Sequence, residues 1–162
     1  MTRGYAFYEQ DSGISNEVSS RPLSMKSLMT KQPFTLAPNN LARDAITLMQ
    51  EKEVRHIPIV DPFSGRLEGL VTEADILRNV LHGKTLTKEE RYHATLDMML
   101  PLKEVMVRAV LTLPPEATVA EAVTLFLRHK IRCAPVVDDQ ERLLGIVTET
   151  DLMRLMEHMV AG

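Results

Sequence analysis

The chain contains the same sequence pattern twice, and this internal repeat constrains its fold more than any other feature. The run GLVTEAD at residues 69–75 returns as GIVTETD at residues 145–151. Upstream of these runs, at a shift of 77 residues, Lys26 matches Lys103, Met29 matches Met106, Arg55 matches Arg132 and Pro58 matches Pro135. A repeat of about fifty residues in only two copies is too long for most solenoid units. We therefore expect two copies of one small α/β unit in a single pseudo-symmetric domain, because neither half alone could bury much core.

The composition is that of a globular protein of ordinary size. The 162 residues suit one domain, with 44% hydrophobic and 25% charged residues. A formal net charge of -3 argues against a nucleic-acid-binding surface, which is normally strongly basic. No apolar run approaches the roughly 18 residues that cross a bilayer, and the polar start lacks the apolar core of a signal peptide. We expect a cytoplasmic protein without a membrane or nucleic-acid partner.

Each copy is predicted to contain a strand, a helix, two strands and a second helix, in that order. The first copy has an extended segment at residues 34–36, which Pro38 stops, and Asn39 or Asn40 is placed to cap the helix that follows. The apolar positions of that helix follow the i, i+3, i+4, i+7 spacing of one buried face. They are Ala42, Ala45, Ile46 and Met49, and the second copy repeats them as Val119, Ala122, Val123 and Phe126.

Two short apolar strands and a turn follow the first helix of each copy. In the first copy the strands are residues 57–60 and 67–71, with a turn at residues 61–65. In the second copy the strands are residues 134–137 and 143–147, with a turn at residues 138–141. The second strand of each copy runs directly into a helix, which in the first copy begins near Glu73.

The repeat also predicts how the chain divides. The expected parts are an N-terminal arm (1–24), a first repeat (25–81), a connecting segment (82–101), a second repeat (102–157) and a tail (158–162). The arm is rich in polar residues and has no apolar period. In the connecting segment, Thr87 and Glu90 have the spacing of a capping box, which predicts a helix that ends before Pro101.

Thr72 and Asp75, with their copies Thr148 and Asp151, admit two interpretations. A Thr followed three residues later by an acidic residue, between a strand and a helix, is typical of a capping box that only closes the helix. A helix N-terminus can also hold phosphate, and a carboxylate one turn in can accept hydrogen bonds from vicinal ribose hydroxyls. The glycine three residues before each Thr either lets the backbone approach a ligand or marks a bulge in the strand. The motif alone leaves both interpretations open.

The single cysteine, Cys133, stands where the first copy has His56. One cysteine excludes an internal disulfide framework, and the exchange argues against catalysis or metal binding that needs either residue. The other histidines lack metal-ligand spacing, and the sequence has no P-loop and no paired nucleophile and base. We expect neither a metal site nor an enzyme, and we expect Cys133 to be a small buried thiol.

The double pattern resembles a tandem pair of CBS domains, often called a Bateman module, over about residues 25–156. Each copy carries a Gly-hydrophobic-Val-Thr-x-x-Asp signature and an Arg-x-x-Pro-hydrophobic-Val segment in the order and spacing of that family. The resemblance implies an α/β (α+β) fold of two pseudo-symmetric repeats, each with a small sheet flanked by two helices and packed through its sheet. It also implies a non-catalytic regulatory module with two clefts that receive adenosine nucleotides.

By the same resemblance, Thr72 and Thr148 would contact phosphate, and Asp75 and Asp151 would bind the ribose hydroxyls. The remaining residues implied to line the two clefts are Thr35, Arg55, His56, Ile57 and Pro58, with Thr112, Arg132, Cys133, Ala134 and Pro135. Simple core packing is the alternative for Ile57, Pro58, Ala134 and Pro135. The exchange of His56 for Cys133 is the first place to look if the two clefts bind with unequal affinity.

The resemblance also indicates which ligand and which partners to expect. Glu73 and Glu149 favour the helix N-termini, and they also place negative charge where a polyphosphate would lie. AMP is therefore favoured as the ligand, ahead of ADP, ATP or S-adenosylmethionine. The resemblance further implies a homodimer that signals ligand occupancy to an effector protein, which the sequence does not identify. The alternative is an interaction or dimerisation scaffold whose clefts stay empty.

Overall fold

The computed structural model describes residues 23–80 and 98–161. The predicted N-terminal arm, apart from its last two residues, and most of the predicted connecting helix lie outside these ranges.

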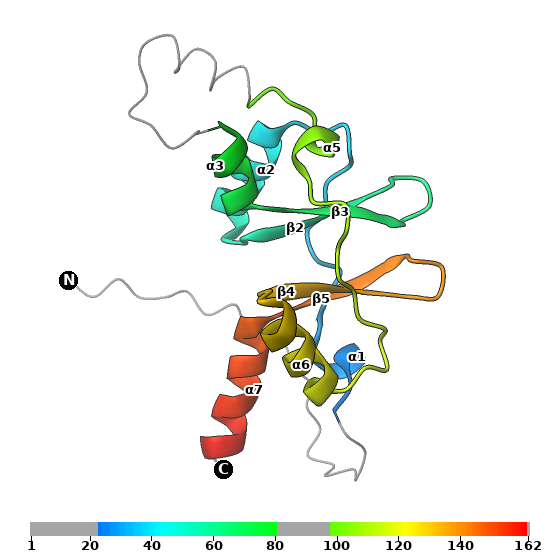
Figure 1. Cartoon of the computed structure of the whole chain (residues 1–162), viewed down its shortest axis with the longest axis vertical. Helices are drawn as coiled ribbons and strands as arrows, with labels where there is room; N and C mark the ends of the chain where they lie inside the picture. Colours follow the sequence, from blue (N-terminus) through cyan, green and yellow to red (C-terminus); the bar gives the residue numbers. More distant parts are fainter. Residues whose placement is uncertain (1–22, 81–97, 162) are drawn as a thin grey trace, which may run out of the picture.

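Two small antiparallel sheets lie at the centre of the molecule, with helices on their outer faces (Figure 1). The first sheet pairs β2 (His56–Val60) with β3 (Leu67–Thr72), and the second pairs β4 (Cys133–Val137) with β5 (Leu143–Thr148). Helices α2 (Ala42–Lys52) and α3 (Glu73–Val80) cover the first sheet, and α6 (Val119–His129) and α7 (Glu149–Ala161) cover the second. The fold class predicted from the repeat is confirmed.

The two hairpins have equivalent registers. Pro58 lies opposite Leu70 in the first, and Pro135 lies opposite Ile146 in the second. The segments predicted as first strands contribute one parallel bridge each, between Leu36 and Ile59 and between Leu113 and Val136. These bridges extend each sheet along the outer edge of β2 and of β4.

Each half has its own apolar core, enclosed between its sheet and its helices. Alternate residues of the strands point to this core, as the period of a β-strand requires. In the first half these include Ile57, Ile59 and Val71, packed with Ala42, Ala45, Met49 and Ile76. In the second half Ala134, Val136 and Val147 pack with Leu113, Ala117, Ala122 and Phe126.

The start of each repeat packs on the other half of the molecule. Helix α1 (Met25–Leu28) begins the first repeat, yet Met25 is fully buried in the core of the second half. Helix α5 (Leu102–Val105) begins the second repeat, yet Leu102 is fully buried in the core of the first half. Figure 1 shows this exchange, with the blue α1 beside α6 and the yellow-green α5 beside α2.

The exchanged segments also join the opposite sheets. Strand β1 (Thr30–Lys31) pairs antiparallel with β5, where Thr30 lies opposite Ile146. On the other side Val107 and Leu70 form the equivalent bridge, with N–H···O distances of 2.9 and 3.0 Å in the two directions. Each sheet therefore contains main chain from both repeats.

This close crossing explains the glycines of the repeated run. A Cβ added to Gly69 would lie 2.6 Å from the Met106 sulfur and 2.9 Å from the Val107 carbonyl oxygen. A Cβ added to Gly145 would lie 2.5 Å from the Met29 sulfur and 2.7 Å from the Thr30 carbonyl oxygen. The sequence left two roles open for these glycines, close approach of a ligand or a bulge in the strand. The structure shows a close approach, but what approaches is the main chain of the exchanged segments at Val107 and Thr30.

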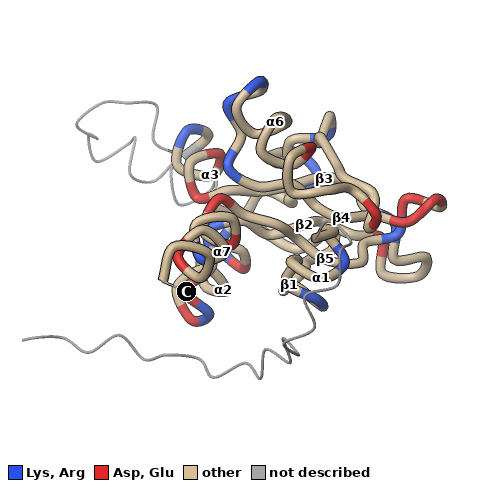
Figure 2. The backbone as a smooth tube through the Cα atoms, turned by 90° about the horizontal axis from the view of Figure 1, so that it is seen from below, with Lys and Arg blue, Asp and Glu red and all other residues tan. Residues whose placement is uncertain are grey.

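The two hairpin turns meet at one edge of the molecule (Figure 2). The Leu67 N–H donates to the Glu141 carbonyl at 2.9 Å, and the Leu143 N–H donates to the Gly65 carbonyl at 3.1 Å. Arg66 forms an ion pair with Glu141 across the same contact. These bonds hold the two repeats together at the end of the sheets away from Thr72 and Thr148.

The predicted cap of α2 was wrong. The Asn40 side chain instead accepts a hydrogen bond from the Ala37 N–H at 2.7 Å, because it closes the turn that follows residue 36. Helix α2 starts after Leu41, whose N–H donates to Asp44 at 2.8 Å. In the second repeat Thr118 does cap α6, by accepting from the Glu121 N–H at 3.3 Å.

Candidate functional site

The repeated Thr and Asp form a reciprocal cap at the start of each second helix. The Thr72 hydroxyl donates to Asp75 Oδ2 at 2.7 Å, and the Asp75 N–H donates to Thr72 Oγ1 at 3.2 Å. The Thr72 N–H also donates to Asp75 Oδ2, at 3.1 Å. Thr148 and Asp151 repeat all three hydrogen bonds, at 2.8, 3.4 and 2.8 Å. Of the two interpretations that the sequence left open, the capping boxes are therefore present at both positions.

The capping arrangement uses one carboxylate oxygen of each Asp. The cap uses Oδ2 of Asp75, while Oδ1 lies 3.6 Å from Nη1 of Arg78, a side chain that is 76% exposed. An ionised carboxylate has about four lone-pair sites, so it can hold the cap and accept from a further donor. The Thr72 hydroxyl has one proton, and it donates that proton to Asp75. A phosphate at this helix N-terminus would thus be met first by backbone N–H groups.

The strands next to the caps present matching positions with different chemistry. His56 lies opposite Thr72 in the first hairpin, and Cys133 lies opposite Thr148 in the second. Burial lowers the pKa of His56; Glu149 opposes this shift, whereas Arg55 and Arg132 add to it. Burial also raises the pKa of Cys133 to about 12, with a smaller contribution from Asp75. Cys133 is therefore a neutral thiol, in agreement with the buried thiol expected from the sequence.

These interactions cross between the two repeats. His56 of the first repeat is affected by the charges of Glu149 and Arg132, and Cys133 of the second is affected by Asp75. Within the second repeat, the Glu149 N–H donates to the Arg132 carbonyl at 2.9 Å, and their side chains are 3.9 Å apart. Charged groups of each predicted set therefore act on a titratable group of the other across the two repeats.

Thr35 and Thr112 lie on the extended segments that border β2 and β4, and both are exposed. The neighbouring Leu36 N–H donates to the Pro58 carbonyl at 3.3 Å, and the Leu113 N–H donates to the Pro135 carbonyl at 3.0 Å. Each Thr is thus held beside the strand that carries the predicted Arg-x-x-Pro segment.

The four residues with a core-packing alternative divide into two pairs. The side chains of Ile57 and Ala134 are fully buried in the two cores, so any contact they make with a ligand is through main chain. Pro58 and Pro135 are fully buried but occupy the alternate strand positions. Their side chains therefore point to the opposite face, between the two sheets.

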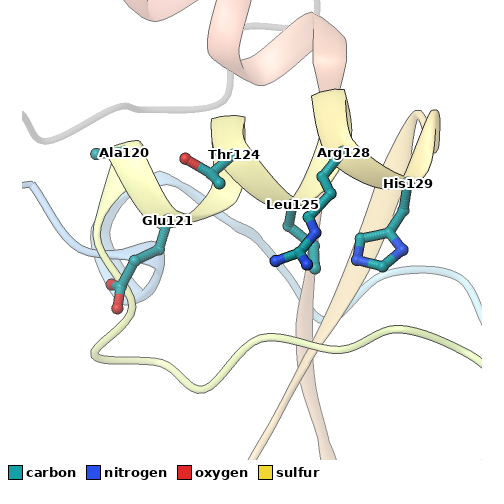
Figure 3. Close-up of a pocket in the computed structure, with 6 residues that line it drawn as sticks. All are labelled: Ala120, Glu121, Thr124, Leu125, Arg128 and His129. Atoms are coloured by element: carbon teal, nitrogen blue, oxygen red, sulfur yellow. The ribbon is translucent and has the colours of Figure 1, made fainter.

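A shallow hollow of about 310 Å³ lies elsewhere, along α6 (Figure 3). It is lined by Ala120, Glu121, Thr124, Leu125, Arg128 and His129. None of the predicted cleft residues lines it. Within residues 23–80 and 98–161, the structure has no group of acidic, His and Cys side chains suited to a metal ion.

The exchanged segments and the hairpin turns each contribute residues to the contacts between the repeats that the sequence did not suggest. Met29 and Met106 cover Gly145 and Gly69, and Arg66 and Glu141 join the hairpin turns. The first pair could have been noticed, because the two methionines match in the repeat. Arg66 and Glu141 gave no such signal.

Comparison with known proteins identifies the same two units. The family model described as "CBS domain" matches residues 25–82 and 102–158. The chain is 35% identical over 130 residues to the CBS domain-containing protein YhcV of Bacillus subtilis, which covers 80% of this chain and 82% of YhcV. It is 30% identical over 135 residues to protein MJ1225 of Methanocaldococcus jannaschii, covering 82% of this chain. The match spans only 48% of MJ1225, about half its length.

A solved structure adds a likeness in three dimensions. The CBS domain pair of protein MJ0100, in complex with 5-methylthioadenosine and S-adenosyl-L-methionine, is similar with a TM-score of 0.71 and 27% identity. The likeness covers 86% of this chain and 99% of that one. Separately, no helix among the described residues has the length and apolar character to span a membrane.

Proposed function

Because this chain belongs to the CBS domain family and carries two such domains in tandem, we propose that it is a non-catalytic regulatory module that binds adenosine ligands between its repeats. The observation that carries the proposal is the pair of Thr-Asp caps. They occupy equivalent helix N-termini, and the charge of Glu149, beside the second cap, acts on His56, which lies opposite Thr72 of the first. Each cap holds a carboxylate in place through Oδ2, and we propose that Oδ1, which in Asp75 lies 3.6 Å from the exposed Arg78, accepts from a ribose hydroxyl.

A relative supports this class of ligand. The similar CBS pair of MJ0100 is described in complex with 5-methylthioadenosine and S-adenosyl-L-methionine, two molecules that share an adenosine group. In our chain, Asp75 and Asp151 would accept from the ribose. The backbone N–H groups that follow Thr72 and Thr148 would face phosphate, because a helix N-terminus attracts anions.

The charges of the region favour a ligand with few negative charges. Glu73, Asp75, Glu149 and Asp151 all lie in the first turns of α3 and α7. Arg55 and Arg132 supply positive charge, but Arg132 is already 3.9 Å from Glu149. The polyphosphate of ATP would meet like charge here. We therefore rank AMP ahead of ADP and ATP, and S-adenosylmethionine, whose tail bears positive charge, remains in the proposal.

The two clefts are expected to differ in affinity. The clefts match at Thr, Asp, Arg and Pro, whereas an imidazole at position 56 faces one and a thiol at position 133 faces the other. We further propose that copies of the chain form a homodimer. Ligand binding would then shift the population of two arrangements of the repeats, and an effector protein would bind one of them preferentially.

A thermal-shift experiment tests the proposal. AMP and S-adenosylmethionine should raise the melting temperature by an amount that grows with ligand concentration, and ATP should raise it less. AMP and S-adenosylmethionine share only the adenosine group, so the chain can respond to one without responding to the other. The thermal shift is therefore evaluated for each ligand separately. Melting curves that stay flat across AMP, ADP, ATP and S-adenosylmethionine would reject nucleotide binding.

One observation favours a second candidate, a scaffold whose clefts stay empty. The caps satisfy Thr72 and Asp75 without any ligand. In a scaffold, Thr72→Ala would lower stability by about 1 kcal/mol, as cap removal does, and would change no ligand response. In the nucleotide-binding module the same variant also weakens the thermal shift by AMP.

A further inference from the structure

In the first half of the molecule, the chain that leads into α5 passes over the start of α2. The Ala42 N–H donates to the Leu100 carbonyl at 2.9 Å, and the Arg43 N–H donates to the Met98 carbonyl at 3.0 Å. The Met98 side chain is half-buried and packs against the core of the first half. Main chain and side chain together thus hold this leading segment on the first turn of α2.

The chain that leads into α1 begins the same path over α6. The Val119 N–H donates to the Leu23 carbonyl at 3.3 Å, and this bond is the copy, at the 77-residue shift of the repeat, of the first bond on α2. Arg21 is the copy of Met98, so the equivalence would bring the Arg21 carbonyl to the Ala120 N–H. It would thus direct the N-terminal arm across the first turn of α6, where the hollow begins.

The hollow along α6 has an acidic end, an apolar middle and a basic end (Figure 3). Glu121 lies at the end next to Ala120, Leu125 lies in the middle, and Arg128 and His129 lie at the far end. Leu125 is half-buried against the core of the second half, whereas Glu121 and Arg128 are exposed. A segment that fits this hollow needs a basic group at its start, an apolar group next and an acidic group at its far end.

The arm residues just before α1 have the complementary order. Reading back from Arg21, the sequence has two serines, then Val18 and then Glu17. From Ala120 to His129 the helix advances about 14 Å, at about 1.5 Å per residue. An extended chain covers about 13 Å in roughly four residues, which is the separation of Arg21 and Glu17. With Arg21 at the start of the hollow, Glu17 reaches the basic end.

We propose that the arm segment EVSSR binds in the hollow along α6 of the same chain, antiparallel to the helix. Arg21 pairs with Glu121, and Glu17 pairs with Arg128. The valine of the segment covers the apolar middle of the hollow. The occupant is the arm of the same chain, because Leu23 is already bonded to the start of α6. The contact is separate from the proposed adenosine site, since none of the predicted cleft residues lines the hollow.

Tryptophan fluorescence tests the contact, because the natural chain contains no tryptophan. A Val18→Trp chain carries a single reporter in the proposed segment, and acrylamide quenches an exposed indole more than a covered one. Arg128→Glu in this chain should raise the quenching constant by about twofold, a size that fits the modest energy of an exposed ion pair. The control Lys130→Glu makes the same charge change outside the hollow and should leave the constant unchanged. Equal quenching in the two charge variants would overturn the contact.

Charge exchange and mixing identify the pair and the chain that supplies the arm. Glu17→Lys, added to the Val18→Trp, Arg128→Glu chain, should restore the lower quenching because it re-forms the pair with opposite signs; quenching that stays high would overturn the pairing. The Val18→Trp, Arg128→Glu chain is also unfolded in urea and refolded with an excess of natural chain. Its quenching should stay high, since each arm binds its own hollow. A fall would assign the arm to the hollow of a second copy and overturn the inference.

Amide hydrogen exchange, followed by NMR on the natural chain, is an independent measurement that needs no reporter. The Ala120 N–H should exchange slowly, as the Arg43 N–H does, because the Arg21 carbonyl accepts from it. Glu17→Arg should speed exchange at Ala120 and leave exchange at Arg43 unchanged, since Met98 is the acceptor there. An Ala120 N–H that exchanges at the rate of an open amide in the natural chain would overturn the inference, whatever the tryptophan chain shows.

Discussion

His56 and Cys133 occupy matching positions beside the two caps, and the fold affects them differently. Burial lowers the pKa of the imidazole and raises the pKa of the thiol to about 12, so burial favours the neutral form of each. Neither neutral side chain adds charge to a region that already holds Glu149 and Arg132. The difference between the clefts is therefore one of size and hydrogen bonding, since an imidazole can both donate and accept.

The lowered pKa of His56 makes stability depend on pH. The unfolded chain takes up a proton near the ordinary value of 6.5, while the folded chain resists protonation until a lower pH. The stabilisation is thus present above pH 6.5 and is lost as the pH falls through the pKa of the folded protein. Urea unfolding at pH 7.5 and pH 5 should show a larger fall in unfolding free energy for the natural chain than for His56→Gln. His129→Gln, at the exposed end of α6, controls for loss of a histidine; equal falls in all three proteins would contradict this account.

The exchanged segments pass so close to β3 and β5 that only glycine fits at positions 69 and 145. Gly69→Ala and Gly145→Ala would each put a methyl against a carbonyl oxygen at 2.9 and 2.7 Å. We expect each to lower the unfolding free energy by about 1–3 kcal/mol, the usual range for overpacking. Glu68→Ala, at the exposed position next to Gly69, should change it by less than about 0.5 kcal/mol. The urea midpoints of the three variants measure this, and unchanged midpoints for both glycine variants would show that the strands do not cross there.

A substitution at the C-terminal end of α6 is expected to raise the unfolding free energy, and α2 ends in the same conformation. Glu53 and Lys130 both have φ of 53°, in the left-handed region where a side chain is strained. Lys130→Gly should raise the unfolding free energy by about 0.5–1 kcal/mol, because glycine adopts this conformation without that strain. Lys130→Ala removes the same charge but keeps the Cβ, so it should give no gain. A gain from alanine equal to that from glycine would assign the effect to charge instead.

Much of this arrangement of elements was predictable from the sequence. The spacing of Ala42, Ala45 and Met49 predicted the buried face of α2, whereas Val123, placed on the equivalent face of α6, is 37% exposed. The Thr-x-x-Asp runs suggested the caps as one of two interpretations. The exchange of α1 and α5 was not predictable, because residues 25–29 and 102–106 are copies of one another and each satisfies either core. Only the path of the connecting main chain decides between the two arrangements. Likewise, the sequence could not show that Ile57 and Ala134 point to the cores, since that depends on which face of each sheet the helices cover.

At the scale of the whole molecule, two kinds of contact hold the repeats together. The crossing segments join each sheet to the other repeat, and the hairpin turns are bonded through Gly65, Leu67, Glu141 and Leu143 at one edge. The caps lie at the ends of β3 and β5 that are away from those turns. A ligand between the caps would therefore act on the angle between two units that are already fixed at the opposite edge. This geometry suits a module that reports occupancy through the arrangement of its repeats.

Titration calorimetry of the natural chain and of the Asp75→Asn, Asp151→Asn double variant tests the central claim most directly. Asparagine keeps an oxygen for the helix cap but replaces the other carboxylate oxygen with a donor, so it removes the acceptor proposed for ribose while sparing the fold. We predict saturable binding of AMP or S-adenosylmethionine with at most two ligands per chain, weakened about 10-fold or more in the double variant, as expected for loss of a hydrogen bond to a charged group. Binding of equal strength in both proteins, or no saturable binding of either ligand by the natural chain, would contradict the claim that the paired caps form an adenosine site.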